Sequence, residues 1–208
     1  WRRCIASLFT ERSVGYHLEN GLHPLDSAVA VVVMKMARSD KACSGVMFTI
    51  DPDSGHEGVI HIASSYGLGE LVVQGVVIPD TFTIWKKGLS EGKSAVVHRT
   101  LGSKEQMLVY DSELVNEVSS VRVPIEMRKR WSLDSDECVK LGGMAVLIEK
   151  FFGKPMDIEW AKDGVDNEIY IVQARPETIH SKTDGNKILM YKMDEKLASN
   201  LKRQGRVI

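Results

Sequence analysis

The sequence has few cysteines and no spacing that pairs them. Cys4, Cys43 and Cys138 are odd in number, widely separated and outside any CxxC pattern. This argues against a disulfide framework and against a cysteine-rich zinc site, and it favours a reducing compartment. The cysteine content therefore predicts a cytoplasmic protein.

The chain also has no excess of positive or negative charge, and it has no long apolar run. Its 27 basic and 28 acidic residues leave a net charge of -1, so we expect no strong field for nucleic acid or a membrane surface. The main apolar run, residues 28–36, is too short to cross a membrane and contains Lys35. With 208 residues and 43% hydrophobic content, the chain is predicted to fold around a core as one domain or two small ones.

Two segments near the end of the chain have the period of β-strands. Residues 156–161 and 168–176 alternate apolar with other side chains, and residues 162–167 between them are typical of a turn. The pattern predicts a β-hairpin, which we take as the centre of the fold and of the function.

Four polar side chains in this hairpin form a candidate site. Because successive strand side chains face opposite sides, Asp157 and Glu159 share one face, as do Gln173 and Arg175. If the two polar faces coincide, they suit a Mg²⁺ ion that carries phosphates, since Mg²⁺ prefers oxygen ligands and guanidinium binds phosphate bidentately. The alternative is a solvated face with ordinary ion pairs, which is common on half-exposed strands.

The remaining patterns predict an α+β protein with helices packed on a sheet. Residues 5–18 have helical spacing, and residues 134–152 form a second helix that begins with a capping box of Asp134 and Glu137. A glycine-rich turn at 66–75 leads into a short helical turn. Strands are predicted at 28–36 (buried on both faces), 44–50, 58–63, 80–85, 95–98 and 107–110.

Several segments, in order, resemble the ATP-grasp domain of the phosphoenolpyruvate synthase family. They are residues 6–12, 35–40, 44–49, 66–75 and 173–178, together with the hairpin. The resemblance implies an ATP-grasp-type mixed β-sheet with packed helices, here as a partial domain. Residues 1–179 would be the C-terminal portion of this nucleotide-binding domain, and 180–208 a linker and the start of a swivelling phosphohistidine domain.

The resemblance also implies roles for individual residues. Glu159 and Gln173 would bind Mg²⁺, Arg175 would clamp the phosphates of ATP, and Asp157 would act beside them, so that Arg175 and Asp157 are the catalytic candidates. Glu70, in the glycine-rich turn, would face the ribose or hold the loop.

The adenine would lie against Met34, Lys35 and Met36. Relatives usually have Gln where this sequence has Met34, and a thioether is a poor hydrogen-bonding group. A polar contact to the nucleotide is therefore expected to be missing.

The resemblance implies an enzyme that passes phosphate from ATP to a histidine and then to pyruvate, releasing AMP and phosphate. None of the six histidines lies in the Thr-x-Gly-Gly-x-x-Cys-His context of that residue. We therefore expect a piece of a longer chain, inactive alone, whose full-length form is a homo-oligomer with ATP and pyruvate as partners. The alternatives are a related dikinase, an antibiotic phosphotransferase, or a nucleotide-binding module without catalysis.

Overall fold

The computed structural model describes residues 1–19, 21–23, 25, 27–111 and 117–178. These form two compact units, Trp1–Met36 and a unit that begins at Ala37, and each is described by itself. The predicted linker at 180–208 lies outside the described residues. The prediction of one domain over residues 1–179 stays a prediction.

The first unit is helical near its start. The predicted helix at 5–18 is present in three pieces, α1 (Arg2–Ala6), the 3-10 helix η1 (Ser7–Phe9) and α2 (Glu11–Glu19). The break falls at Thr10, whose backbone is extended with ψ 150°. The expectation of one continuous helix over 5–18 is therefore wrong, and apolar side chains such as Phe9 and Leu18 are exposed within this unit.

The valine-rich run at 28–36 forms no strand. Most of its side chains are exposed, and Val33 is 93% exposed. Valine favours strands, but a strand requires a hydrogen-bonded neighbour, and no strand among the described residues pairs with this run. The prediction of a doubly covered strand here is wrong.

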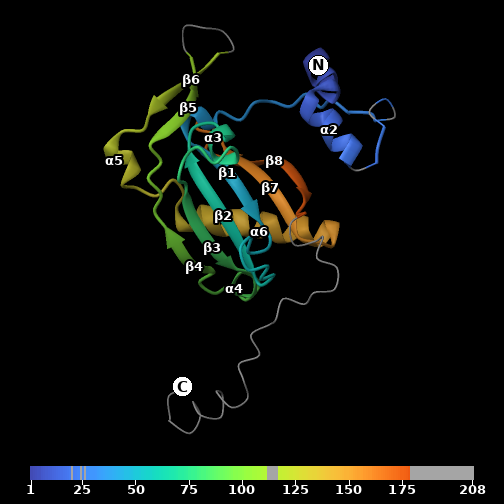
Figure 1. Ribbon diagram of the computed structural model, residues 1–208. Coiled ribbons are helices and arrows are strands. Elements are labelled where there is room, and N and C mark those ends of the chain that lie inside the picture. Colours follow the sequence, from blue (N-terminus) through green and yellow to red (C-terminus); the bar gives the residue numbers. More distant parts are fainter. Residues whose placement is uncertain (20, 24, 26, 112–116, 179–208) are drawn as a thin grey trace. The chain divides into compact units, whose positions relative to one another are not determined.

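The second unit is built on a six-stranded sheet with the order β4-β3-β2-β1-β7-β8 (Figure 1). Every neighbouring pair is antiparallel, so the α+β class is confirmed but the expectation of a mixed sheet is wrong for the described residues. The predicted strands at 44–50, 58–63, 80–85 and 95–98 and the hairpin are confirmed. The strands are β1 (Cys43–Phe48), β2 (Val59–Tyr66), β3 (Asp80–Trp85), β4 (Val96–Thr100), β7 (Met156–Lys162) and β8 (Ile169–Pro176).

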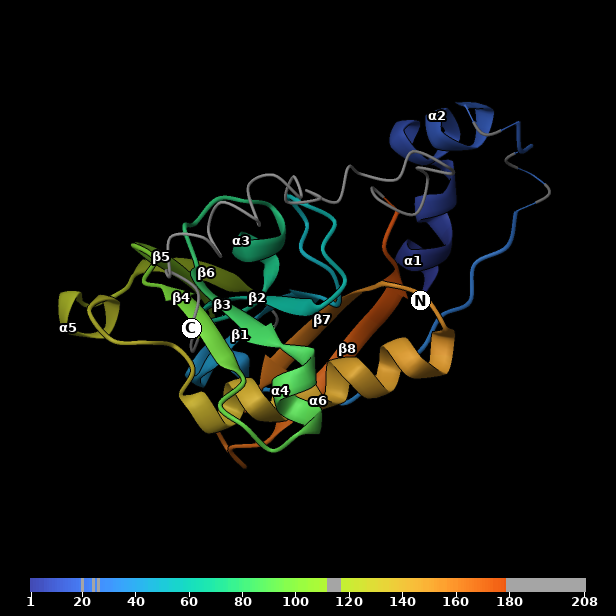
Figure 2. The same ribbon diagram turned by 90° about the horizontal axis from the view of Figure 1, so that it is seen from below.

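One long helix, α6 (Ser135–Phe152), covers one face of the sheet (Figure 2). It begins with the predicted capping box, in which Asp134 accepts from the Glu137 amide, and it ends at Gly153 in the left-handed conformation. Its buried side chains form a core with alternate residues of the strands. That core includes Met47, Ile62, Phe82, Leu141, Ala145, Met156, Ile158 and Trp160.

Smaller elements lie at both ends of the sheet. The predicted strand at 107–110 is confirmed as β5 (Gln106–Tyr110), which pairs with β6 (Val118–Arg122) in a separate two-stranded sheet. No helix within the described residues has the length and apolar character that a membrane span needs. The short helices are η3 (Ser39–Lys41), α3 (Glu70–Val73), α4 (Lys86–Ser90) and α5 (Ile125–Arg128). Of these, α4 lies at the end of the sheet opposite to that of α3 and β5 (Figure 1).

Candidate functional site

The hairpin β7–β8 brings the four predicted polar side chains to one face of the sheet. Glu159 lies opposite Gln173, and Asp157 lies opposite Arg175. Met156, Ile158 and Trp160 alternate with the two acids and are buried in the core on the other face. The condition that the two polar faces coincide is therefore met, whereas the roles of these residues as ligands stay predictions.

A β-bulge makes this arrangement possible. Trp160 pairs with Ile171 but Glu159 pairs with Gln173, so Val172 is an extra residue in β8. Without it, strict alternation from Ile171 would place Gln173 on the core face. Strict alternation in the sequence does not predict this bulge; the signal for it is that Ile171 and Gln173, two residues apart, differ in polarity.

The guanidinium of Arg175 is held by one oxygen of Asp157. Its Nε and one terminal nitrogen each lie 2.8 Å from Oδ2 of Asp157. The Asp157 side chain is 13% exposed and that of Arg175 is 59% exposed. The acid is thus anchored in the sheet and orients a guanidinium whose remaining N–H groups face solvent.

The backbones of Glu159 and Gln173 are paired in the ladder of β7 and β8, but their side chains have no hydrogen bond or ion pair to any described residue. Residues opposite each other on antiparallel strands have Cβ atoms about 4.5–5.5 Å apart. A carboxylate and an amide oxygen therefore stand side by side with no competing partner, and Asp157 lies next to them. This donor set fits Mg²⁺, which typically takes one or two carboxylates and completes its shell with waters and phosphate oxygens.

The described residues contain no group of three or more His, Cys, Asp or Glu side chains placed to hold a metal ion. The candidate pair at Glu159 and Gln173 is of a different kind, because one of its ligands is an amide.

The polar face continues across the sheet toward β2 and β3. Phe48 pairs with Asp157 on one side and with His61 on the other, and His61 pairs with Thr83. Burial lowers the pKa of His61 below its ordinary value, and the opposing effect of nearby Asp51 is smaller. No functional role is predicted for His61 from the sequence, but its alternation with Ile60 and Ile62 is the signal that places it on this face.

The glycine-rich turn lies on the same face of the sheet. Ser44 is on the face of β1 that carries Val46, the neighbour of Glu159, and its Oγ donates to the Gly67 carbonyl over 2.6 Å. Two residues along a strand span about 7 Å, so the turn sits close to the row that contains Glu159. Glu70 begins α3, is exposed, and accepts a hydrogen bond from Gln74.

Met34, Lys35 and Met36 belong to the first unit. Met34 and Met36 are exposed, 62% and 60%. Their assignment to the adenine stays a prediction.

The sheet with one helix-covered face and one polar face, bearing an oxygen-rich pair beside an arginine, defines a candidate nucleotide-phosphate site. In agreement with that class, the chain belongs to the pyruvate phosphate dikinase AMP/ATP-binding domain family, whose model matches residues 1–196.

Among curated proteins the chain is similar to phosphoenolpyruvate synthases. It is 45% identical to that of Neisseria meningitidis over 88% of this chain, 46% identical to that of Escherichia coli over 87%, and 43% identical to that of Aquifex aeolicus over 92%. It spans 23% of the length of each of these relatives. The predicted resemblance is confirmed.

Proposed function

We propose that this chain is the Mg²⁺-ATP-binding part of an enzyme that converts pyruvate, ATP and water into phosphoenolpyruvate, AMP and phosphate. The observation that carries the proposal is the unpartnered pair Glu159 and Gln173 beside the Asp157–Arg175 ion pair. Similarity to proteins named phosphoenolpyruvate synthase supports the choice of product.

In this proposal each residue of the hairpin has a separate task. Glu159 and Gln173 hold the cation, and Arg175 binds phosphate oxygens through the N–H groups that face solvent. Asp157 keeps the guanidinium in place. A bound Mg²⁺ supplies charge neutralisation at the phosphates, which together with positioning is most of what phosphoryl transfer requires.

The same proposal includes the type of fold, the domain bounds, further contacts to the nucleotide and the state of the full-length protein. The fold is of ATP-grasp type, residues 1–179 are the C-terminal portion of that domain, and residues beyond 179 lead to a domain with the phosphorylated histidine. Met34, Lys35 and Met36 line the adenine, and Glu70 lies near the ribose. The full-length protein is a cytoplasmic homo-oligomer that serves gluconeogenesis.

The test uses the full-length protein with ATP, Mg²⁺ and pyruvate, and it measures AMP and phosphoenolpyruvate. Glu159→Gln keeps the shape of the side chain and removes its charge, so we expect turnover to fall by about 100-fold or more, because a metal ion contributes several kcal/mol of charge stabilisation. The matched control is Glu57→Gln, an exposed acid in a turn, which should leave turnover unchanged. Full turnover in Glu159→Gln would remove the proposed metal site.

A second candidate is a pyruvate phosphate dikinase, which the description of the matching family favours. The two reactions differ in the acceptor of the second phosphoryl group. Release of inorganic phosphate indicates water as that acceptor, whereas consumption of phosphate and release of pyrophosphate indicates the dikinase.

A further inference from the structure

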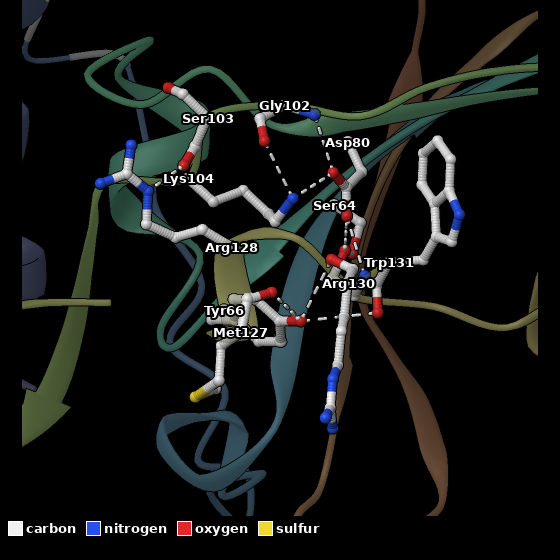
Figure 3. Close-up of polar contacts among 11 residues, drawn as sticks. Ser64, Tyr66, Asp80, Gly102, Ser103, Lys104, Met127, Arg128, Arg130 and Trp131 are labelled. Carbon is white, nitrogen blue, oxygen red and sulfur yellow. Dashed lines mark hydrogen bonds and ion pairs between the residues drawn. The ribbon is translucent and has the colours of Figure 1, made fainter. Parts of the chain in front are cut away.

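A second polar cluster lies where β2 ends and β3 begins, and the proposed reaction does not use it (Figure 3). Its centre is an ion pair between Asp80 and Lys104, both fully buried, with Nζ of Lys104 2.5 Å from Oδ1 of Asp80. Lys104 also donates to the Gly102 carbonyl over 3.0 Å. Its backbone has a φ of 41°, an uncommon conformation for a residue other than glycine.

Asp80 fixes two other segments to the sheet. Besides Lys104, its carboxylate accepts from the Gly102 amide and from the amide and hydroxyl of Ser132, each over 2.8 Å. Since separation of a buried ion pair is strongly unfavourable, these contacts hold the loop at 102–104 against the start of β3.

The anchored loop leads directly into β5, and β5 contacts the glycine-rich turn. The Leu68 amide donates to the Leu108 carbonyl over 3.0 Å. Gly67 has a φ of 83°, and a Cβ at this position would lie 2.6 Å from the same carbonyl oxygen. The contact is so close that only glycine fits without displacing either segment.

A further hydrogen bond supports the same end of the sheet. The hydroxyl of Tyr66, next to the turn, donates to the Met127 carbonyl over 3.0 Å at the end of α5. Arg128 of α5 donates in turn to the Ser103 carbonyl over 2.8 Å. The turn is therefore connected to the anchored loop through β5 and through α5. Figure 3 shows the second of these routes, from Tyr66 through Met127 and Arg128 to Ser103.

We infer that the Asp80–Lys104 pair and β5 position the glycine-rich turn, and with it Glu70, on the polar face beside Glu159. In this role they are positioning residues that set the affinity for ATP and not the rate of phosphoryl transfer. The inference rests on the proposed function, because it takes the polar face as the nucleotide-binding face.

The test compares Gly67→Ala with Gly92→Ala in the full-length protein. Gly92 has a φ of 65° and nothing within 4 Å of an added Cβ, so its substitution has the same backbone strain but no clash. For Gly67→Ala we expect the KM for MgATP to rise about tenfold, the equivalent of one lost hydrogen bond. We expect kcat to stay within about twofold, because only binding is affected.

The possible outcomes separate the inference from the proposed function. A wild-type protein that makes no AMP with pyruvate contradicts the proposed function. An active wild type in which Gly67→Ala and Gly92→Ala have equal KM values contradicts the inference alone, as does a fall in kcat without a change in KM.

Should Gly67→Ala fail to fold, hydrogen exchange of the wild-type protein gives an independent result. The Leu68 amide should exchange slowly, because it is bonded to β5. Exchange as fast as that of an exposed turn would overturn the inference.

Discussion

Glu159 of β7 lies directly opposite Gln173 of β8, although alternation from Ile171 would place Val172 in that position. One extra residue in β8 thus brings the two candidate ligands to the same face. Bulges of this kind occur next to functional sites, where they redirect a side chain.

Deletion of Val172 tests the importance of this bulge. The deletion restores simple alternation, so either Gln173 and Arg175 turn toward the core or Ile169 and Ile171 turn toward solvent. We expect AMP formation by the full-length protein to be lost. Val172→Thr retains the bulge and should remain active; equal activity of the deletion variant would show that the register is not required.

Arg175→Lys tests the guanidinium as a phosphate clamp. Lysine keeps the charge but cannot form two parallel hydrogen bonds. A charge-assisted hydrogen bond is worth about 1.5–3 kcal/mol, so we expect kcat/KM for ATP to fall about 10- to 100-fold.

The thermal midpoint of Arg175→Lys should change little, because the ion pair with Asp157 is 59% exposed on the arginine side. Arg122→Lys, at an exposed residue of β6, is the matched control. A large loss of stability together with unchanged kinetics would instead indicate a structural role for Arg175.

The Asp80–Lys104 pair should dominate the local stability of the sheet. Asp80→Asn leaves a buried ammonium without its counter-charge, and we expect a loss of about 3–5 kcal/mol. Glu126→Gln breaks an exposed ion pair with Lys129 and should cost less than about 0.5 kcal/mol. The measurement is the urea dependence of hydrogen exchange at amides of β3, and equal effects of the two substitutions would contradict the expectation.

Two buried thiols should make the protein less stable in alkali. Burial raises the pKa of Cys43 and of Cys138 to about 12 from an ordinary value of 9.0. Above pH 9 the unfolded chain releases these protons while the folded chain retains them, so the free energy of unfolding falls as the pH rises toward 12.

This pH dependence can be assigned with two matched variants. Cys138→Ala should flatten the decline between pH 9 and 11, whereas Cys4→Ala should not, because Cys4 is exposed. The readout is the urea midpoint at each pH, and an identical slope in both variants would rule out the buried thiol as a cause.

The sequence predicted those elements whose signals are local. The alternation in residues 156–161 predicted which side chains of the hairpin share a face, because in a strand with one buried side the apolar residues recur at every second position. The capping box of Asp134 and Glu137 predicted the start of α6, and this signal is also local because both partners lie within one helical turn.

Features that depend on residues far apart in the chain could not be predicted correctly from the sequence. The run at 28–36 has the composition of a buried strand but no hydrogen-bonded neighbour among the described residues. Asp80 and Lys104 lie 24 residues apart, so their pairing depends on the fold and leaves no local pattern. The bulge at Val172 depends on the register with β7, which composition does not encode.

The order of the strands has a consequence for synthesis. β1 lies between β2 and β7, and the Thr49 hydroxyl just after β1 accepts from the Met156 amide, 107 residues later in the chain. At translation rates of about 5–20 residues per second, one edge of this hydrophobic strand stays open on the ribosome for roughly 5 to 20 seconds. The nascent chain therefore passes through an aggregation-prone interval, which ends only when the hairpin that bears Glu159 has left the exit tunnel.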